Sequence, residues 1–379
     1  MTDAANGTVA TLPPFVLTAG GTGGHLFPAQ ALAEELLRRG RDLVLVTDAR
    51  ASGLADRFPG ISVRVIRAAA PVGGLLNRAR AALLLALGLL DARAILRTLR
   101  PAAVVGFGGY ASLPTVQMAQ TMGIPTVLHE QNAHMGRANR RMSRHAAALA
   151  LSFADTRAAT GPTVLVGNPV RGAVAAVGEA AYVAPDPRGD TPIGILVFGG
   201  SQGARIFSDV VPGALGDLPE ALRRRLHVTQ QARPEDLGRV RAAYSDAGMS
   251  ATVETFFDDM PRHLADSHLV IARSGASTVT ELAAAARPAI LVPYPHAADD
   301  HQSANAEAAR ACGAAWTVPN VRFDRATCMR SVMALLEDPA ALGRMSAAAR
   351  TSARLNAASD LADLVEKIGA GQTIGDERP

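Results

Sequence analysis

The sequence is poor in lysine, cysteine and aromatic residues. Lys367 is the only lysine among 379 residues, aromatic side chains make up 4%, and the two cysteines are Cys312 and Cys328. Nucleic-acid surfaces interleave basic side chains with aromatic rings on which bases stack, so we expect no nucleic-acid partner. Two cysteines far from any histidine pattern do not form a metal cage. Both are therefore expected to be reduced and structural.

Long apolar runs are also missing. No stretch of 18 apolar residues is available to span a bilayer, and the first basic residue is Arg38, which argues against a secretory leader. The composition, 48% hydrophobic and 19% charged, is typical of a soluble globular enzyme. The length is sufficient for two domains with separate cores, and we expect the chain to stay in the cytoplasm.

Short apolar runs alternate with amphipathic ones along the chain. "FVLTAGG", "AQALAEELLRRG", "RDLVLVTD" and "ISVRVIR" predict strand, helix, strand and strand, with Gly40 ending the helix. A Pro-, Gly- and Ala-rich stretch from Gly167, "GNPVRGAVAAVGEAAYVAPDPRGDTP", reads as a linker, and "IGILVFGGSQGARIFSDVV" then restarts the alternation. The pattern predicts an α/β fold of two Rossmann-like, doubly wound parallel-sheet domains facing a cleft. We expect them at 1–171 and 172–354, with a helix at about 355–368 returning to the first.

Three glycine loops follow apolar runs directly. They are "GGTGGH" at 20–25, "GFGGY" at 106–110 and "GGSQGA" at 199–204. Glycine lets the backbone approach an oxygen-rich ligand, and the N-terminus of a following helix attracts negative charge. The loops therefore predict a diphosphate ligand at the carboxyl ends of the strands.

The first loop has three other interpretations. A dinucleotide-binding dehydrogenase needs G-x-G-x-x-G, and Asp48 lies where its ribose carboxylate would be, but Leu26 occupies the third glycine position. A P-loop is excluded because no G-K-[ST] occurs. The glycines could also serve helix and strand packing alone, which leaves the adjacent His25, Tyr110 and Ser201 unexplained.

Eight motifs occur together in one order: "GGTGGHLFPA", "GFGGYASLP", "HEQNAHMGRANR", "VGNPVR", "GGSQGA", "FFDDM", "RSGASTVTEL" and "PAILVPYPHAADDHQSANA". From about residue 15 to 315 the chain resembles the MurG family, the undecaprenyldiphospho-muramoylpentapeptide N-acetylglucosaminyltransferases of glycosyltransferase family 28. The resemblance implies a GT-B fold and transfer of N-acetylglucosamine from UDP-GlcNAc to the lipid-linked muramoyl pentapeptide, lipid I, giving lipid II. It implies inversion at the anomeric carbon and no cofactor.

The resemblance places the donor on the third glycine loop and around residues 276–281. Ser201 is expected to meet the diphosphate or to cap a helix, and Glu281 to accept hydrogen bonds from the ribose hydroxyls. Arg171 is expected to bind phosphate oxygens or to form an interdomain salt bridge. By the family's pattern Phe257 contacts uracil and Gln302 the sugar. The complete predicted donor set is Thr22, Gly23, Gly24, Asn132, Arg171, Ser201, Phe257, Ala276, Ser277, Thr278, Val279, Thr280, Glu281, Gln302 and Asn305.

The first two glycine loops would face the acceptor's lipid diphosphate. His25 is the first candidate for the base that removes a proton from the acceptor's 4-hydroxyl, because imidazole titrates near neutral pH; Glu130 is the second. His25 could instead hydrogen-bond to the acceptor diphosphate. The predicted acceptor-binding residues are Gly108, Gly109, Tyr110, His129 and Asn139.

Residues 81–90 are apolar on every face and are flanked by arginines. They predict either a patch that docks on anionic lipid at the cytoplasmic face of the bacterial inner membrane or a buried helix. Asp299, Asp300 and His301 suggest a metal, but no second histidine follows at the required spacing, so no metal site is predicted. Two functional alternatives stay open: another UDP-sugar enzyme of the same fold, such as a UDP-GlcNAc epimerase, and a non-enzymatic scaffold at the membrane.

Overall fold

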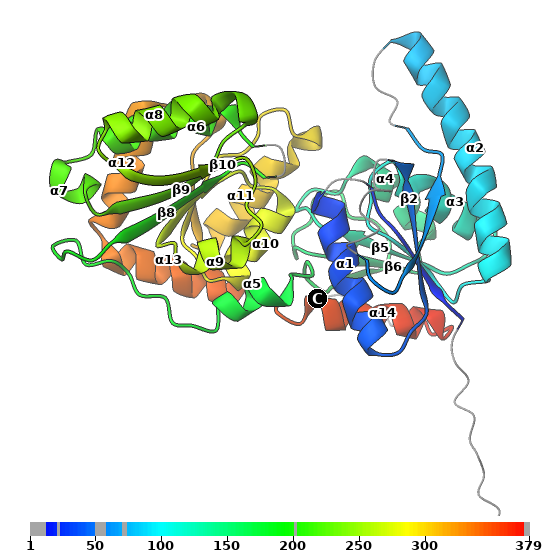
Figure 1. The fold of residues 1–379 in the computed structure, drawn as a ribbon. Helices are drawn as coiled ribbons and strands as arrows, with labels where there is room; N and C mark the ends of the chain where they lie inside the picture. The colour runs from blue at the N-terminus through cyan, green and yellow to red at the C-terminus, as the bar shows by residue number, and fades with distance from the viewer. Residues whose placement is uncertain (1–12, 21–22, 50–57, 70–73, 201–202, 375–379) are drawn as a thin grey trace, which may run out of the picture.

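Two α/β domains lie side by side in the computed structural model, which describes residues 13–20, 23–49, 58–69, 74–200 and 203–374 (Figure 1). Each domain has a central parallel sheet with helices on both faces. The predicted fold class of two Rossmann-like domains is confirmed. Thr22 and Ser201, both predicted site residues, lie outside the described residues.

The first domain contains, among the described residues, a seven-stranded sheet in which every pairing is parallel. In spatial order its strands are β3 (Ser62–Ile66), β2 (Leu43–Asp48), β1 (Phe15–Thr18), β4 (Val104–Gly106), β5 (Thr126–Glu130), β6 (Ala148–Leu151) and β7 (Thr163–Leu165). Its helices are α1 (Gly23–Arg38), α2 (Leu75–Leu99), α3 (Ser112–Thr121) and α4 (Arg137–Met142).

The second domain has a six-stranded parallel sheet within the described residues. Its spatial order is β10 (Ser250–Glu254), β9 (Leu226–Gln231), β8 (Ile193–Phe198), β11 (Leu269–Ala272), β12 (Ala289–Leu291) and β13 (Ala315–Thr317). The surrounding helices are α6 (Arg205–Gly216), α7 (Glu220–Arg223), α8 (Leu237–Asp246), α9 (Met260–Ala265), α10 (Ala276–Ala284), α11 (His301–Ala311), α12 (Arg325–Leu336) and α13 (Pro339–Ser352).

Alternate residues of a strand pack into the core on opposite faces of the sheet. In β1, Phe15 and Leu17 pack in the cluster that contains α1 residues, whereas Val16 packs in the cluster that contains Leu96 of α2 and Val116 of α3. This two-residue period explains why strands that are covered on both faces are almost continuously apolar in sequence. The two sheets therefore have separate cores.

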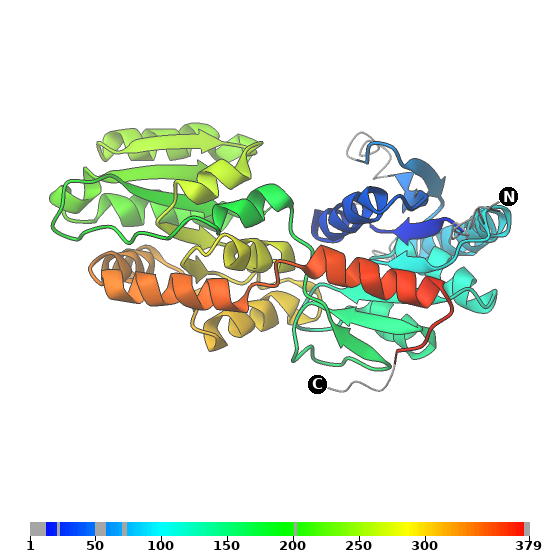
Figure 2. The ribbon, with the colours of Figure 1, turned by 90° about the horizontal axis from the view of Figure 1, so that it is seen from below.

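The chain crosses between the domains twice. The first crossing follows β7 and was predicted to be a linker, but it includes a short helix, α5 (Gly172–Val177), because Val174 is fully buried against the second domain. The second crossing follows α13 and leads to α14 (Ala357–Gly369), which packs on the first domain (Figure 2). The crossings touch: Gly167 has φ +91°, and a Cβ atom there would lie 2.7 Å from the Cβ of Arg354. Only glycine fits this position.

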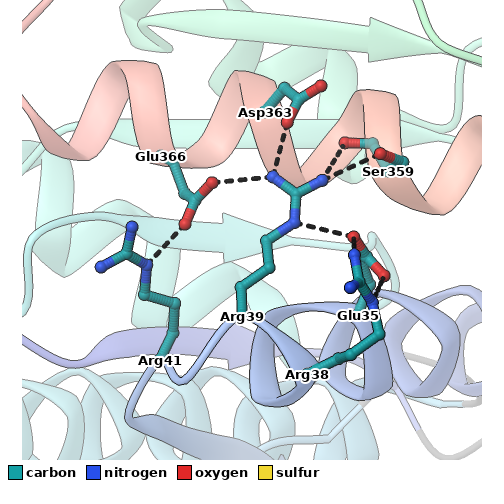
Figure 3. A network of polar contacts seen from close by, with 7 residues as sticks. All are labelled: Glu35, Arg38, Arg39, Arg41, Ser359, Asp363 and Glu366. Carbon is teal, nitrogen blue, oxygen red and sulfur yellow. Dashed lines mark hydrogen bonds and ion pairs between the residues drawn. The ribbon is translucent and has the colours of Figure 1, made fainter.

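Ion pairs fasten α14 to the end of α1 (Figure 3). Arg39 donates to Glu35 at 2.7 Å, to Asp363 at 2.5 Å and to Glu366 at 2.7 Å, and Arg41 donates to the same Glu366 at 2.5 Å. Because Arg39 is largely buried and Glu35 and Glu366 are each shared with a second arginine, this is a network rather than a set of isolated surface pairs. The C-terminal helix is thus part of the first domain.

Candidate functional site

A cavity of about 620 Å³ lies between the domains at the carboxyl ends of the strands. Its walls come from α1, from the loop after β8, from the start of α10 and from the loops after β9 and β12. The predicted donor residues that line it are Gly24, Arg171, Phe257, Ala276, Ser277, Thr278, Glu281 and Gln302. Gly23 is the first residue of α1.

The third glycine loop leads into α6 at the cavity wall. Ala204 is the N-cap of α6, and within the described residues no side chain caps the N–H groups of Arg205 and Ile206 at the start of this helix. Gln231, at the end of β9, accepts a hydrogen bond from the N–H of Gly199 at 3.0 Å, which ties the loop to the neighbouring strand. The arrangement provides a fixed, electropositive position for a phosphate group.

Glu281 and Arg171 form an ion pair inside the cavity. The Nη2 of Arg171 donates to Oε1 of Glu281 at 3.0 Å, and the guanidinium lies 5.1 Å from the centre of the Phe27 ring. Burial raises the pKa of Glu281, and Arg171 acts in the opposite direction. The Nε of Arg171 is buried without a hydrogen-bond partner among the described residues. Arg171 therefore connects α1 of the first domain to α10 of the second.

Opposite faces of α10 line different cavities. Ser277, Thr278 and Glu281 face the 620 Å³ cavity, whereas Val279 and Thr280, predicted with them as donor residues, line a second cavity of about 310 Å³ near the two crossings. Thr280 accepts a hydrogen bond from the side chain of Asn168 at 3.0 Å. Consecutive helical residues point about 100° apart, so one helix cannot turn a run of six residues toward a single ligand.

Asn132 and Asn305 form a hydrogen bond across the domain boundary. The Nδ2 of Asn305 donates to Oδ1 of Asn132 at 3.1 Å, and its Oδ1 accepts from the N–H of Ala133 at 2.8 Å. Asn305 is fully buried and neither residue is in the lining of the large cavity. In this arrangement both asparagines connect the loop after β5 to α11, the helix that carries Gln302.

His25 lies beside the second glycine loop. Cβ atoms placed on Gly108 and Gly109 would approach its imidazole to 3.5 and 3.6 Å, so both glycines pack directly against the ring. Burial, with a smaller contribution from His301 of the second domain, lowers the pKa of His25 to about 4. The imidazole is consequently neutral at pH 7. Tyr110, the next residue of the loop, is 40% exposed.

Glu130 is buried and saturated with hydrogen bonds. Its two oxygens accept from the N–H and side chain of Asn132 at 3.0 and 3.1 Å, from the N–H of Gly136 at 3.0 Å and from Asn139 at 2.9 Å. The carboxylate thus organises the loop after β5, an arrangement that favours a structural role over that of a base. The Oδ1 of Asn139 lies near Gly108 and has no partner among the described residues.

His129 is also enclosed. It is fully buried, its Nε2 lies 2.9 Å from the carbonyl oxygen of Gly167, and its Nδ1 lies 3.1 Å from Nε2 of Gln131. Gln131 donates its amide hydrogen, so the neutral tautomer protonated on Nε2 satisfies both contacts. Burial lowers the pKa of His129 to about 4. The structure therefore places His129 beneath the first crossing, and it is absent from the linings of both cavities.

The acidic loop before α11 faces arginines. Arg137 of the first domain donates to both carboxylate oxygens of Asp299, at 3.1 and 2.9 Å, and Arg140 lies 3.6 Å away. Within the described ranges no group of three or more His, Cys, Asp or Glu side chains is arranged to hold a metal ion.

Several cavity residues were not among those predicted. Among them are Phe27 of α1, Arg205 at the start of α6, Arg233 after β9, Arg273 after β11, and Tyr294, His296 and Asn320 after β12 and β13. Position was the available signal, because loops at the carboxyl ends of neighbouring parallel strands meet at one edge of the sheet. The glycine motifs indicate where the backbone can approach a ligand closely, but they do not indicate which side chains face it.

Models of two known domains match the chain. The glycosyltransferase family 28 N-terminal domain matches residues 15–151, and the family 28 C-terminal domain matches residues 194–365. A protein of Rhodospirillum centenum is 49% identical, over 97% of this chain and 98% of its own length. One of Paramagnetospirillum magneticum is 50% identical, over 93% and 96%. Both are named UDP-N-acetylglucosamine–N-acetylmuramyl-(pentapeptide) pyrophosphoryl-undecaprenol N-acetylglucosamine transferase.

Solved structures agree with this result. The crystal structure of Acinetobacter baumannii MurG superposes with a TM-score of 0.76 at 29% identity, covering 94% of this chain and all of that one. UDP-GlcNAc 2-epimerase from Neisseria meningitidis, bound to UDP-GlcNAc, gives 0.66 at 14% identity over 93% of this chain and all of its own, a likeness of fold alone. The resemblance seen in the sequence motifs is confirmed, and the chain belongs to glycosyltransferase family 28.

Proposed function

We propose that the chain transfers N-acetylglucosamine from UDP-GlcNAc to lipid I, undecaprenyl-diphospho-N-acetylmuramoyl-pentapeptide, with inversion at the anomeric carbon, giving lipid II. One observation carries the proposal: eight residues predicted to bind the donor line a single interdomain cavity. Relatives about half identical to this chain over nearly its full length carry the name of this reaction. No cofactor is required by this chemistry.

The donor would bind with its diphosphate at the N-terminus of α6. There the N–H groups at the start of the helix would meet the charge that develops on the leaving UDP, and Arg171, which also lines the cavity, would add a guanidinium. Glu281 would accept hydrogen bonds from the ribose hydroxyls, and Phe257 would contact uracil. Gln302 would contact the sugar; its carbonyl oxygen Oε1 already accepts from the N–H of Tyr294 at 2.9 Å, so its amide group has a fixed direction.

The acceptor would enter from the first domain, beside the glycine loops. Its 4-hydroxyl attacks the anomeric carbon on the face opposite the leaving diphosphate, so no covalent enzyme intermediate is needed. His25 is the proposed base because its imidazole is neutral at pH 7 and lies against Gly108 and Gly109. The Oδ1 of Asn139, near Gly108, has no hydrogen-bond partner among the described residues. It would accept a hydrogen bond from a hydroxyl or N–H group of lipid I.

Contact with the membrane would involve α2. Leu76, Leu83 and Leu90 are 88%, 60% and 60% exposed, and their seven-residue spacing places them on one face of the helix. Arginines lie before and after residues 81–90, and their positive charges would favour binding to anionic lipid. No helix in the described part of the chain is long and apolar enough to cross a bilayer. The proposal is peripheral binding at the cytoplasmic face of the inner membrane.

The decisive experiment supplies radiolabelled UDP-GlcNAc with and without lipid I. We expect label to appear in the lipid product and free UDP to be released only when lipid I is present. A UDP-GlcNAc epimerase, the second candidate for this fold, would change the donor without acceptor. Turnover of the donor in the absence of lipid I would therefore refute the proposed function.

A further inference from the structure

The 620 Å³ cavity has a marked excess of positive charge. Four arginines line it, Arg171, Arg205, Arg233 and Arg273, against one carboxylate, that of Glu281. Three of the arginines already have partners within the protein. Arg171 pairs with Glu281 at 3.0 Å, Arg205 with Asp209 at 3.6 Å, and Arg273 donates to two carbonyl oxygens and to Asn320 at 2.9–3.0 Å.

Arg233 differs from the other three because its side chain takes part in none of the ion pairs or side-chain hydrogen bonds formed by the described residues. Its Nε, like that of Arg171, is buried without a hydrogen-bond partner among those residues. A buried guanidinium N–H without an acceptor is unfavourable, because the group has lost its water and gained nothing in return. An anionic ligand in the cavity would satisfy it.

The position of Arg233 indicates which part of a ligand it would meet. Arg233 follows β9, the strand beside β8, so it leaves the sheet at the same edge as the third glycine loop. A Cβ atom on Gly203 would lie 3.3 Å from Cγ of Arg233, so the aliphatic stem of the arginine lies over this glycine. Gly203 has φ +67° and immediately precedes Ala204, the N-cap of α6. The stem therefore starts where the helix offers its free N–H groups.

We propose that Arg233 binds the diphosphate of the nucleotide donor, together with the N-terminus of α6. Its guanidinium stabilises the negative charge of the leaving diphosphate, whereas residues of α10 contact the nucleoside. A planar guanidinium suits phosphate oxygens because it can donate two parallel hydrogen bonds. This inference rests on the proposed function, since it takes the cavity to be the UDP-GlcNAc site.

Calorimetric titration of the full-length chain with UDP and with uridine tests the proposal. Arg233→Gln should weaken UDP binding about 10- to 100-fold, the loss expected for a charged hydrogen bond, and leave uridine binding unchanged. Arg233→Lys should recover part of the UDP affinity. Arg262→Gln is the matched control, because Arg262 is 75% exposed, belongs to the same domain and is absent from the cavity lining.

Three outcomes would overturn the inference. UDP binding by Arg233→Gln that equals the wild type would remove Arg233 from the site. An equal loss of UDP and uridine affinity, in a variant whose unchanged melting temperature shows that it is folded, would mean that the substitution disturbs the whole cavity. Failure of the wild-type chain to bind UDP would refute the proposed function itself, which keeps the two ideas separable.

Discussion

Replacement of Glu281 by alanine is the most direct probe of ribose recognition. The carboxylate is mostly buried, lines the donor cavity and has one protein partner, Arg171, which occupies Oε1 at 3.0 Å. Oε2 and the second lone pair of Oε1 can accept from the two vicinal hydroxyls of the ribose. We expect Glu281→Ala to bind UDP less tightly than the wild type.

The magnitude follows from the environment of the carboxylate. A hydrogen bond from a ligand hydroxyl to a buried charged group contributes about 1–3 kcal/mol, which corresponds to about 5- to 150-fold in Kd. The substitution also frees Arg171. Because the side chain of Arg171 is 30% exposed, water can solvate much of its charge, and this indirect effect should be smaller than the loss of the hydroxyl contacts.

A thermodynamic cycle isolates the ribose contact. UDP and 2′-deoxy-UDP are titrated calorimetrically into the wild type, Glu281→Ala and Arg171→Gln. The wild type and Arg171→Gln should prefer UDP over the deoxy ligand, and Glu281→Ala should bind both almost equally. If Glu281→Ala retains the full preference for UDP, Glu281 does not read the ribose and its role is to hold Arg171.

Three other predictions concern the base, the membrane and metals. The acid limb of kcat/KM should lie near pH 4, where His25 becomes protonated, and His25→Asn should lower kcat at least about 100-fold; an acid limb near pH 6.5 would contradict a buried His25 as base. Glutamate at both Leu83 and Leu90 should abolish binding to anionic vesicles while turnover of a detergent-soluble acceptor continues; a lowered melting temperature would instead indicate that these side chains support the fold. Excess chelator should leave part of the wild-type rate, and complete loss restored by magnesium or manganese would return Asp299 and Asp300 to consideration as ligands.

The sequence was sufficient to predict both sheets and the edge at which the interdomain cavity lies. Apolar runs such as "FVLT" and "LVLVTD" became fully buried strands, and α1 ends at Arg38, just before Gly40. The helix α5 was missed because the Pro, Gly and Ala content of its stretch indicated a linker, although Val170, Val174 and Val177 have helical spacing. It forms where Val174 can be buried against the second domain, a tertiary contact that no local pattern contains.

Side-chain direction was the part of the site that the sequence could not supply. Thr280 and Glu281 are neighbours in one motif and belong to different cavities. A buried polar side chain needs a hydrogen-bond partner, but the sequence does not show whether that partner belongs to a ligand or to the protein. Residues 81–90 are apolar throughout, so the sequence could not indicate which of them face solvent; the structure exposes Leu83 and Leu90 and half-buries Leu84.

The return of α14 to the first domain has a consequence for how the chain folds during its synthesis. Leu361, Val365 and Ile368 belong to the same buried cluster as Phe15 and Leu17, so the core that begins with the first strand is completed by the last helix. A ribosome releases these residues only after the whole second domain has been made. The domain that is translated first is therefore finished last, and until then its α1 surface stays uncovered where α14 will pack.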